Sequence, residues 1–170
     1  MLGKESLEQQ SVKDLKKYIF YGDRLVQSKA KAPNGTEIDF NFISVKLDDG
    51  NTLGVHEMIA MILEQCRMMV EKDAGTKVPD AAITVPVYFT QRERQALIEA
   101  AELAGINVLS LINEPTAYAL QHALDFASSF TEPKNVLLVD LGESALQLSL
   151  FKYEQVAGKD KKNVTQVRML

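Results

Sequence analysis

The chain has 170 residues, of which 46% are apolar and 25% charged, a composition typical of ordinary globular domains. Its 19 basic and 23 acidic residues give a net charge of -4 and are scattered along the sequence, so no basic face for nucleic acid is indicated. A single cysteine excludes an internal disulfide framework, and no apolar run reaches the roughly 18 residues of a membrane span. We therefore expect one domain, with no nucleic-acid partner and no membrane span.

The first third of the sequence changes from a polar segment to a strand pattern. Residues 1–35 are polar and weakly periodic, and the run from Lys29 to Gly35 predicts a loop. Apolar residues between Ile38 and Leu47 then predict strands. The residues at 48–51 (Asp-Asp-Gly-Asn) tolerate a tight turn, so we expect a hairpin that closes near Leu53.

A long amphipathic helix is predicted from Val55 to Lys72, because apolar residues recur there at three- and four-residue spacing. Gly75 is a typical helix stop. Cys66 lies within the apolar stripe, so we expect a buried structural thiol rather than a nucleophile. The methionines of this helix are expected to pack in the core or between lobes rather than to line a promiscuous groove.

The next segment alternates strands and helices. Strands are predicted at residues 81–85, 108–112 and 136–139, with a helix capped by Thr90 and stopped by Gly105, and another from residue 114 to about residue 127. A half-exposed strand at 145–153 follows a turn at 141–144, and residues 164–169 indicate a further strand. This order predicts an α/β fold, preceded by a subdomain that combines the β-hairpin with the long helix.

Two carboxylates stand where strands end. Asp140 begins a tight turn after one apolar strand, and Glu114 follows another and precedes Pro115, a favoured first residue of a helix. Taken alone, Asp140 fits a turn residue and Glu114 fits a helix cap equally well. Both strand ends are expected at one edge of one sheet, where the pair suits metal-assisted phosphoryl transfer. One carboxylate would hold the waters of a magnesium ion, and the other would orient the attacking water.

Four runs in this region carry a family resemblance. They read Ala-Ile-Thr-Val-Pro-Val-Tyr-Phe at 82–89, Gln-Arg-Glu-Arg-Gln-Ala at 91–96, Ala-Gly-Ile-Asn-Val-Leu at 104–109 and Ile-Asn-Glu-Pro-Thr-Ala at 112–117. In order and spacing they resemble the ATPase domain of the heat-shock protein 70 family. The resemblance is most specific from Val78 to Val139 and extends more loosely over nearly the whole chain.

The resemblance implies a partial actin-like, ribonuclease H-like ATPase domain, a mixed sheet with flanking helices. It matches Glu114 to the catalytic glutamate and Asp140 to the aspartate that holds Mg²⁺ through water. ATP or ADP would be bound with the help of a phosphate hairpin, and other positions would relay nucleotide state to a substrate domain. The hairpin residues are Asp140, Gly142, Glu143, Ser144 and Ala145, and the relay residues are Pro86, Arg94 and Pro115.

This sequence departs from the family pattern at the phosphate hairpin. Where the family has Asp-Leu-Gly-Gly-Gly-Thr, this chain has Glu143, Ser144 and Ala145 after Gly142. The substitutions remove two glycines and a hydroxyl, and they add a negative charge. The resemblance also places the first phosphate hairpin upstream of residue 1 and the second lobe beyond residue 170. We therefore expect residues 1–170 to be an incomplete nucleotide-binding domain, mostly its first lobe, that holds no nucleotide tightly and is inactive alone.

The altered hairpin and the segments at 151–154 and 164–168 look most like the large, hypoxia up-regulated branch of the family. That branch implies an endoplasmic reticulum lumen location, although the chain starts without a signal core. Glycosylation triplets at Asn34 and Asn163 fit this compartment. The implied function is an ATP-regulated stress chaperone that binds unfolded polypeptides. The alternatives are a non-catalytic nucleotide exchange factor for a partner chaperone and a sugar-kinase-like enzyme.

Overall fold

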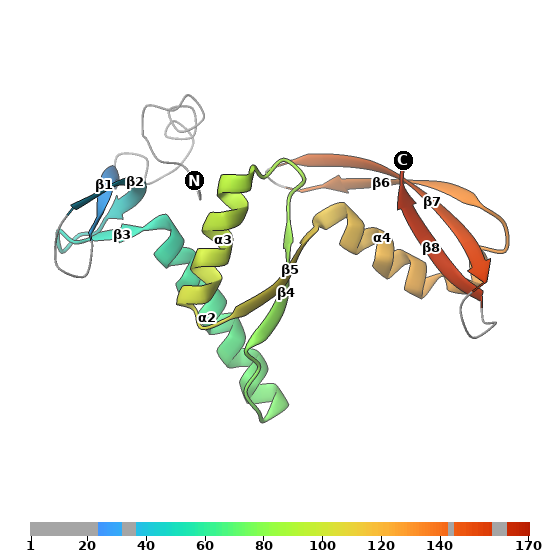
Figure 1. Cartoon of the computed structure of the whole chain (residues 1–170), viewed down its shortest axis with the longest axis horizontal. Coiled ribbons are helices and arrows are strands. Elements are labelled where there is room, and N and C mark those ends of the chain that lie inside the picture. The colour runs from blue at the N-terminus through green and yellow to red at the C-terminus, as the bar shows by residue number, and fades with distance from the viewer. Residues whose placement is uncertain (1–23, 32–36, 143–144, 158–162) are drawn as a thin grey trace. The chain divides into compact units, whose positions relative to one another are not determined.

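The computed structural model describes residues 24–31, 37–142, 145–157 and 163–170. The chain divides into two compact units, the first formed by Met1–Ala82 with Phe89–Ser110 and the second by Ile83–Tyr88 with Leu111–Leu170. Figure 1 labels the elements of both units along the chain. The assignment of the whole chain to one incomplete nucleotide-binding domain stays a prediction.

The first unit begins with an antiparallel sheet of β1 (Leu25–Lys31), β2 (Glu37–Lys46) and β3 (Thr52–Gly54), in that order. Buried Leu25 and Ile43 form its small core. The predicted hairpin is confirmed as β2 and β3. The loop predicted from Lys29 onward is wrong up to Lys31, because these residues pair with β2. Backbone pairing forms this edge strand, and it needs few apolar side chains.

Two helices, α2 (Val55–Ala74) and α3 (Gln91–Leu103), pack against each other in the same unit. The predicted caps are confirmed. The amide of Thr90 donates to the Glu93 carboxylate at 2.7 Å, while the Thr90 hydroxyl accepts a hydrogen bond from the amide of Glu93. Gly75 ends α2 with φ = 66°, a conformation that glycine adopts without steric cost. Arg67 of α2 donates to the Ala104 carbonyl at 3.0 Å, which ties the two helices together.

The burial predicted for α2 is wrong. Cys66 is exposed, and Ala60 is the buried residue of this helix. The other large side chains on α2 that stand exposed are Met58, Met61, Ile62, Met68, Met69 and Val70. The amphipathic pattern predicts the helix correctly, but α3 covers only part of the apolar stripe.

Strand β4 (Asp80–Val85) precedes α3 in the sequence and β5 (Asn107–Asn113) follows it. The two strands pair to form a two-stranded sheet. Asn107 fixes the start of this strand pair with two hydrogen bonds. Its backbone amide donates to the Pro79 carbonyl at 2.7 Å, and its side-chain Nδ2 donates to the Asp80 carboxylate at 2.7 Å. The strand–helix–strand order predicted from the sequence is therefore confirmed.

The second unit places helix α4 (Glu114–Asp125) against an antiparallel sheet of β6 (Lys134–Leu141), β7 (Leu146–Ala157) and β8 (Asn163–Met169). A short 3-10 turn, η2 (Ala127–Ser129), follows α4. Figure 1 shows α4 lying along this three-stranded sheet. The shared core contains Ala119, Ala123, Phe130, Phe151 and Tyr153. The mixed α/β fold predicted from the sequence is thus found.

Exposed and covered side chains alternate along β6 from Asn135 to Leu141 and along β7 from Leu146 to Phe151. One face packs on α4, and the opposite face carries a stripe of exposed aliphatic residues near the turn that joins the two strands. We name this stripe the outer face, and it consists of Leu137, Val139, Leu141, Leu146, Leu148 and Leu150.

Candidate functional site

Glu114 is the first residue of α4 and directly follows β5. Asn113, the extended residue just before Glu114, is the N-cap of the helix, and Pro115 is buried in the first turn. A proline is favoured there because the first amides of a helix have no intrahelical partner. The partial positive charge of the helix N-terminus stabilises a carboxylate at this position.

Asp140 lies near the end of β6, on the half-buried positions that face α4 rather than on the outer face. Its partner across the antiparallel pair is Gln147 of β7. The Gln147 side chain reaches α4, where its Nε2 donates to Oε2 of Glu114 at 2.6 Å. One glutamine therefore links the strand pair that carries Asp140 to the helix end that carries Glu114.

Tyr118 stands one helical turn after Glu114, on the same side of α4, and its ring is half exposed. The pKa of its phenol is raised, first by the negative charge of Asp140, then by partial burial, by the charge of Glu114 and by a hydrogen bond to Asp140. A hydroxyl beside a carboxylate keeps its proton, because the phenolate would be repelled. Both carboxylates therefore act on the same phenol.

These contacts correct one part of the prediction for Glu114 and Asp140. The two residues do not share one sheet, since Glu114 follows the β4–β5 sheet and Asp140 belongs to the β6–β7–β8 sheet. The chain nevertheless brings the carboxylates together, because α4 packs on β6 and β7. Their catalytic roles stay predictions.

The turn after Asp140 is partly described. The amide of Gly142 donates to the carbonyl of Ala145 at 3.0 Å, which closes the β6–β7 hairpin. A Cβ on Gly142 would lie 3.6 Å from that carbonyl, an ordinary contact. Glu143 and Ser144 lie outside the described residues, so phosphate binding by this hairpin stays a prediction. Leu141, predicted in the turn, is the last residue of β6, where it pairs with Leu146.

The three predicted relay residues fall in different units. Pro86 follows β4 in the second unit, where Pro115 also lies, and Arg94 belongs to α3 in the first unit. The Nε of Arg94 donates to the carbonyl of Phe89 at 3.1 Å. Their relay role stays a prediction.

Of the two glycosylation candidates, Asn34 lies outside the described residues and Asn163 is the first residue of β8. Within the described ranges, no cluster of three or more His, Cys, Asp or Glu residues is placed to hold a metal ion. In the same ranges, no helix is long and apolar enough to cross a membrane.

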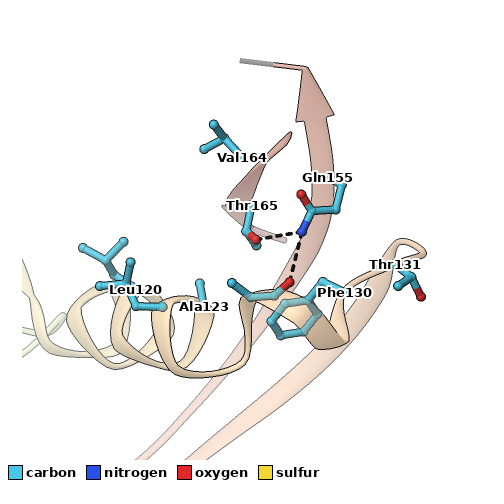
Figure 2. A pocket seen from close by; sticks show the side chains of 9 residues that line it. Leu120, Ala123, Phe130, Thr131, Gln155, Val164 and Thr165 are labelled. Carbon is cyan, nitrogen blue, oxygen red and sulfur yellow. Dashed lines mark hydrogen bonds between the residues drawn. The ribbon is translucent and has the colours of Figure 1, made fainter. Parts of the chain in front are cut away.

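A groove lies at the opposite end of α4 from Glu114, between this helix end and β8. Figure 2 shows its lining, which is mostly apolar, with the Gln155 amide between α4 and β8. The Nε2 of Gln155 donates to the carbonyl of Ala127 and to the hydroxyl of Thr165, both at 3.1 Å. These bonds make Gln155 a structural tie between the end of α4 and the β7–β8 pair.

Sequence reasoning missed Tyr118 and Gln147. Tyr118 could have been found from its spacing, since a residue four positions after Glu114 lies on the same face of the helix. Gln147 follows from the hairpin register, because a pair between Leu141 and Leu146 places Gln147 opposite Asp140. The contact between Gln147 and Glu114 depends on how α4 packs, and no sequence pattern indicates that packing.

The mixed α/β arrangement of sheets and flanking helices is that of a partial actin-like ATPase domain. The family model described as "Hsp70 protein" matches residues 9–161, so the chain belongs to the Hsp70 family.

The similar proteins include one from a plant and others from bacteria. The chain is 40% identical over 121 residues to heat shock 70 kDa protein 17 of Arabidopsis thaliana. This alignment covers 69% of this chain and 14% of that protein. It is 39% identical over 99 residues to a chaperone protein HscA homolog of Acinetobacter baylyi, covering 58% of this chain and 16% of that protein. A homolog with the same name from Acinetobacter baumannii is 41% identical over the same length. The chain thus spans only 14% to 16% of the length of these relatives.

Proposed function

We propose that this chain is part of the nucleotide-binding domain of an ATP-regulated chaperone, and that Glu114 and Asp140 belong to its nucleotide site. The observation that carries the proposal is the convergence of these two carboxylates around Tyr118 and Gln147 within one unit. Membership of the Hsp70 family supports it. The chaperone activity would act on unfolded polypeptides in the whole protein.

The donor set fits magnesium. Mg²⁺ is commonly held by one or two carboxylates with several waters retained, so two acidic groups suffice. Asp140 would hold the ion through its waters, and the bound ion would neutralise charge on the phosphates of ATP. The Gln147 amide holds the carboxylate of Glu114 in place through Oε2, and this carboxylate would orient the attacking water.

The test replaces the matching segment of the Arabidopsis heat shock 70 kDa protein 17 with residues of this chain and measures ATP hydrolysis and binding of a fluorescent ATP analogue. In that chimera, Glu114→Ala is expected to abolish hydrolysis and retain binding, and Asp140→Asn to weaken magnesium-dependent binding. Asp125→Asn is the control, because Asp125 is exposed at the other end of α4 and pairs with Gln121. Equal losses in all three variants would contradict the proposal.

A second candidate function is a non-catalytic nucleotide exchange factor for a partner chaperone. It is favoured by one feature, the replacement of two glycines and a threonine by Glu143, Ser144 and Ala145. An exchange factor would speed release of labelled ADP from an ordinary-sized Hsp70 without hydrolysing ATP itself. Comparing ADP release with and without the protein separates the two candidates.

The cellular setting is part of the same proposal. The hypoxia up-regulated branch and the endoplasmic reticulum lumen are supported by the altered hairpin and by the triplets at Asn34 and Asn163. Expression of the whole protein in cultured cells, followed by removal of N-linked glycans and a gel-mobility assay, tests this. A mobility shift that disappears in the double variant Asn34→Gln, Asn163→Gln supports the lumen, and an unmodified cytosolic product contradicts it.

A further inference from the structure

The orientation of the Gln147 amide is fixed by its partner. Only the NH₂ group of a glutamine can donate, so the end that faces Glu114 at 2.6 Å must be Nε2. The other end, Oε1, is buried and accepts no hydrogen bond from the described residues. A buried acceptor without a partner is unfavourable, so the bond to Glu114 has to offset this cost.

The two carboxylates have neutral partners. Glu114 accepts a hydrogen bond from the amide of Gln147. Asp140 lies opposite Gln147 across the β6–β7 pair, and Tyr118 lies one turn after Glu114 on the same face of α4, where the charge of Asp140 raises the pKa of its phenol. Neither carboxylate appears in an ion pair among the described residues. Two acidic groups around one phenol repel each other unless donors or cations compensate. Here the compensation comes from neutral donors in the chain itself.

We propose that Gln147 and Tyr118 are positioning residues that hold Glu114 and Asp140 together with neutral hydrogen-bond donors, so that the pair keeps its arrangement without a bound cation. We call this group of four residues the neutral clasp. It deepens the proposed function, because it prearranges the site for nucleotide before magnesium arrives. The contacts themselves need no nucleotide, so they can be tested on the 170-residue chain.

The decisive variant is Gln147→Glu, which keeps the shape of the side chain and replaces the donor with an acceptor. Three carboxylates would then face one another, and the folded-to-unfolded ratio should fall by about tenfold to a hundredfold, the range expected for a hydrogen bond to a charged group. Millimolar Mg²⁺ should restore most of the loss, since three carboxylates suit a divalent cation. The wild-type chain should gain almost nothing from Mg²⁺.

The matched control is Gln121→Glu. Gln121 also donates through Nε2 to a carboxylate, that of Asp125 at 2.8 Å, but this pair is exposed on the surface of α4. The same chemical change should therefore lower the folded-to-unfolded ratio only about twofold, without recovery in Mg²⁺. Urea unfolding followed by circular dichroism measures both variants. Equal losses in both, or wild-type stabilisation by Mg²⁺ as large as that of Gln147→Glu, would overturn the proposal.

A second variant avoids the added charge. Gln147→Met keeps the side-chain length and removes the donor, so a loss of about tenfold is expected, and a loss below about twofold would overturn the role of Gln147. The side-chain amide resonances of Gln147 in nitrogen-15 NMR provide a direct readout. They should shift in Glu114→Ala and stay in place in Asp125→Ala.

Tyr118 is tested by a double-mutant cycle with Asp140. Tyr118→Phe should lower the folded-to-unfolded ratio in the wild-type background and have a smaller effect when Asp140 is already Asn, because the partner charge is gone. Additive losses would show that Tyr118 does not position Asp140. None of these measurements involves ATP. An intact clasp in a chimera that binds no ATP would therefore refute the proposed function alone.

Discussion

Tyr153 is the residue whose replacement best tests the core of the second unit. Its side chain is fully buried, stacks on Phe130 with ring centroids 4.6 Å apart, and contacts the ring of His122 edge-on. Its hydroxyl donates to the carbonyl of Ala119 at 3.2 Å. The packing and the hydrogen bond can be separated, because phenylalanine keeps the ring and removes only the hydroxyl.

The expected magnitudes differ. Tyr153→Phe should lower the free energy of unfolding by about 1 kcal/mol, the net contribution of one hydrogen bond. Tyr153→Ala should lower it by about 4 kcal/mol, because it leaves a cavity and removes the stacking partner of Phe130. Urea unfolding followed by circular dichroism gives both values. The control is Leu148→Ala, on the same strand but on the outer face with 59% exposure, where a change within about 0.5 kcal/mol is expected.

The hydroxyl also predicts a dependence on pH. Burial raises the pKa of Tyr153 above its ordinary value of 10.0. The unfolded chain therefore loses this proton first, and the stability contributed by the neutral phenol declines as pH rises above 10.0. Tyr153→Phe lacks this decline. A Phe variant as unstable as the Ala variant, or a Leu148→Ala loss equal to that of Tyr153→Ala, would refute the packing described here.

Three further predictions follow from the structure. The pKa of Glu71 is lowered, first by a hydrogen bond from the amide of Val78 and then by Arg67, so the stability of the fold should fall as the pH drops below 4.5. Thermal melts across this acidic range should show a flatter decline for Glu71→Gln. A decline as steep as that of the wild type would contradict this role of Glu71. The exposed aliphatic side chains of the outer face should promote association of the chain. Sedimentation should then show oligomers that increase with protein concentration and that become fewer in Leu148→Lys. A monomer whose thermal transition is sharp and independent of concentration would count against this. The chain should bind Mg-ATP very weakly and release no phosphate, because the described site offers two carboxylates and few donors to the phosphates; micromolar affinity in calorimetry, with turnover abolished by Asp140→Asn, would show otherwise.

The sequence predicts the elements well where local chemistry decides them. Thr90 and Gly75 mark helix ends through a side-chain acceptor and a left-handed backbone, and both act in the structure as expected. Strand β1 was missed because its pairing uses the backbone, and the lysine at 29 is typical of a loop. The alternation in β7 correctly predicted an antiparallel strand with one covered face.

The site was predicted less completely than the fold. Glu114 and Asp140 stand out because each follows an apolar strand, but their neighbours depend on packing between α4 and the sheet. The burial of Cys66 was predicted wrongly for a related reason: periodicity shows which residues share a face, and it does not show how much of that face another element covers. Contacts between elements are therefore what the structure adds.

The exposure of Cys66 has a practical consequence for following this protein in solution. It is the single cysteine of the chain, it lies on the surface of α2, and the chain contains no tryptophan. A maleimide dye would therefore attach at one known position without any substitution, and its emission would not overlap with an intrinsic indole signal. Labelled protein could then report through energy transfer whether α2 approaches a second, dye-labelled molecule, with the native sequence kept intact.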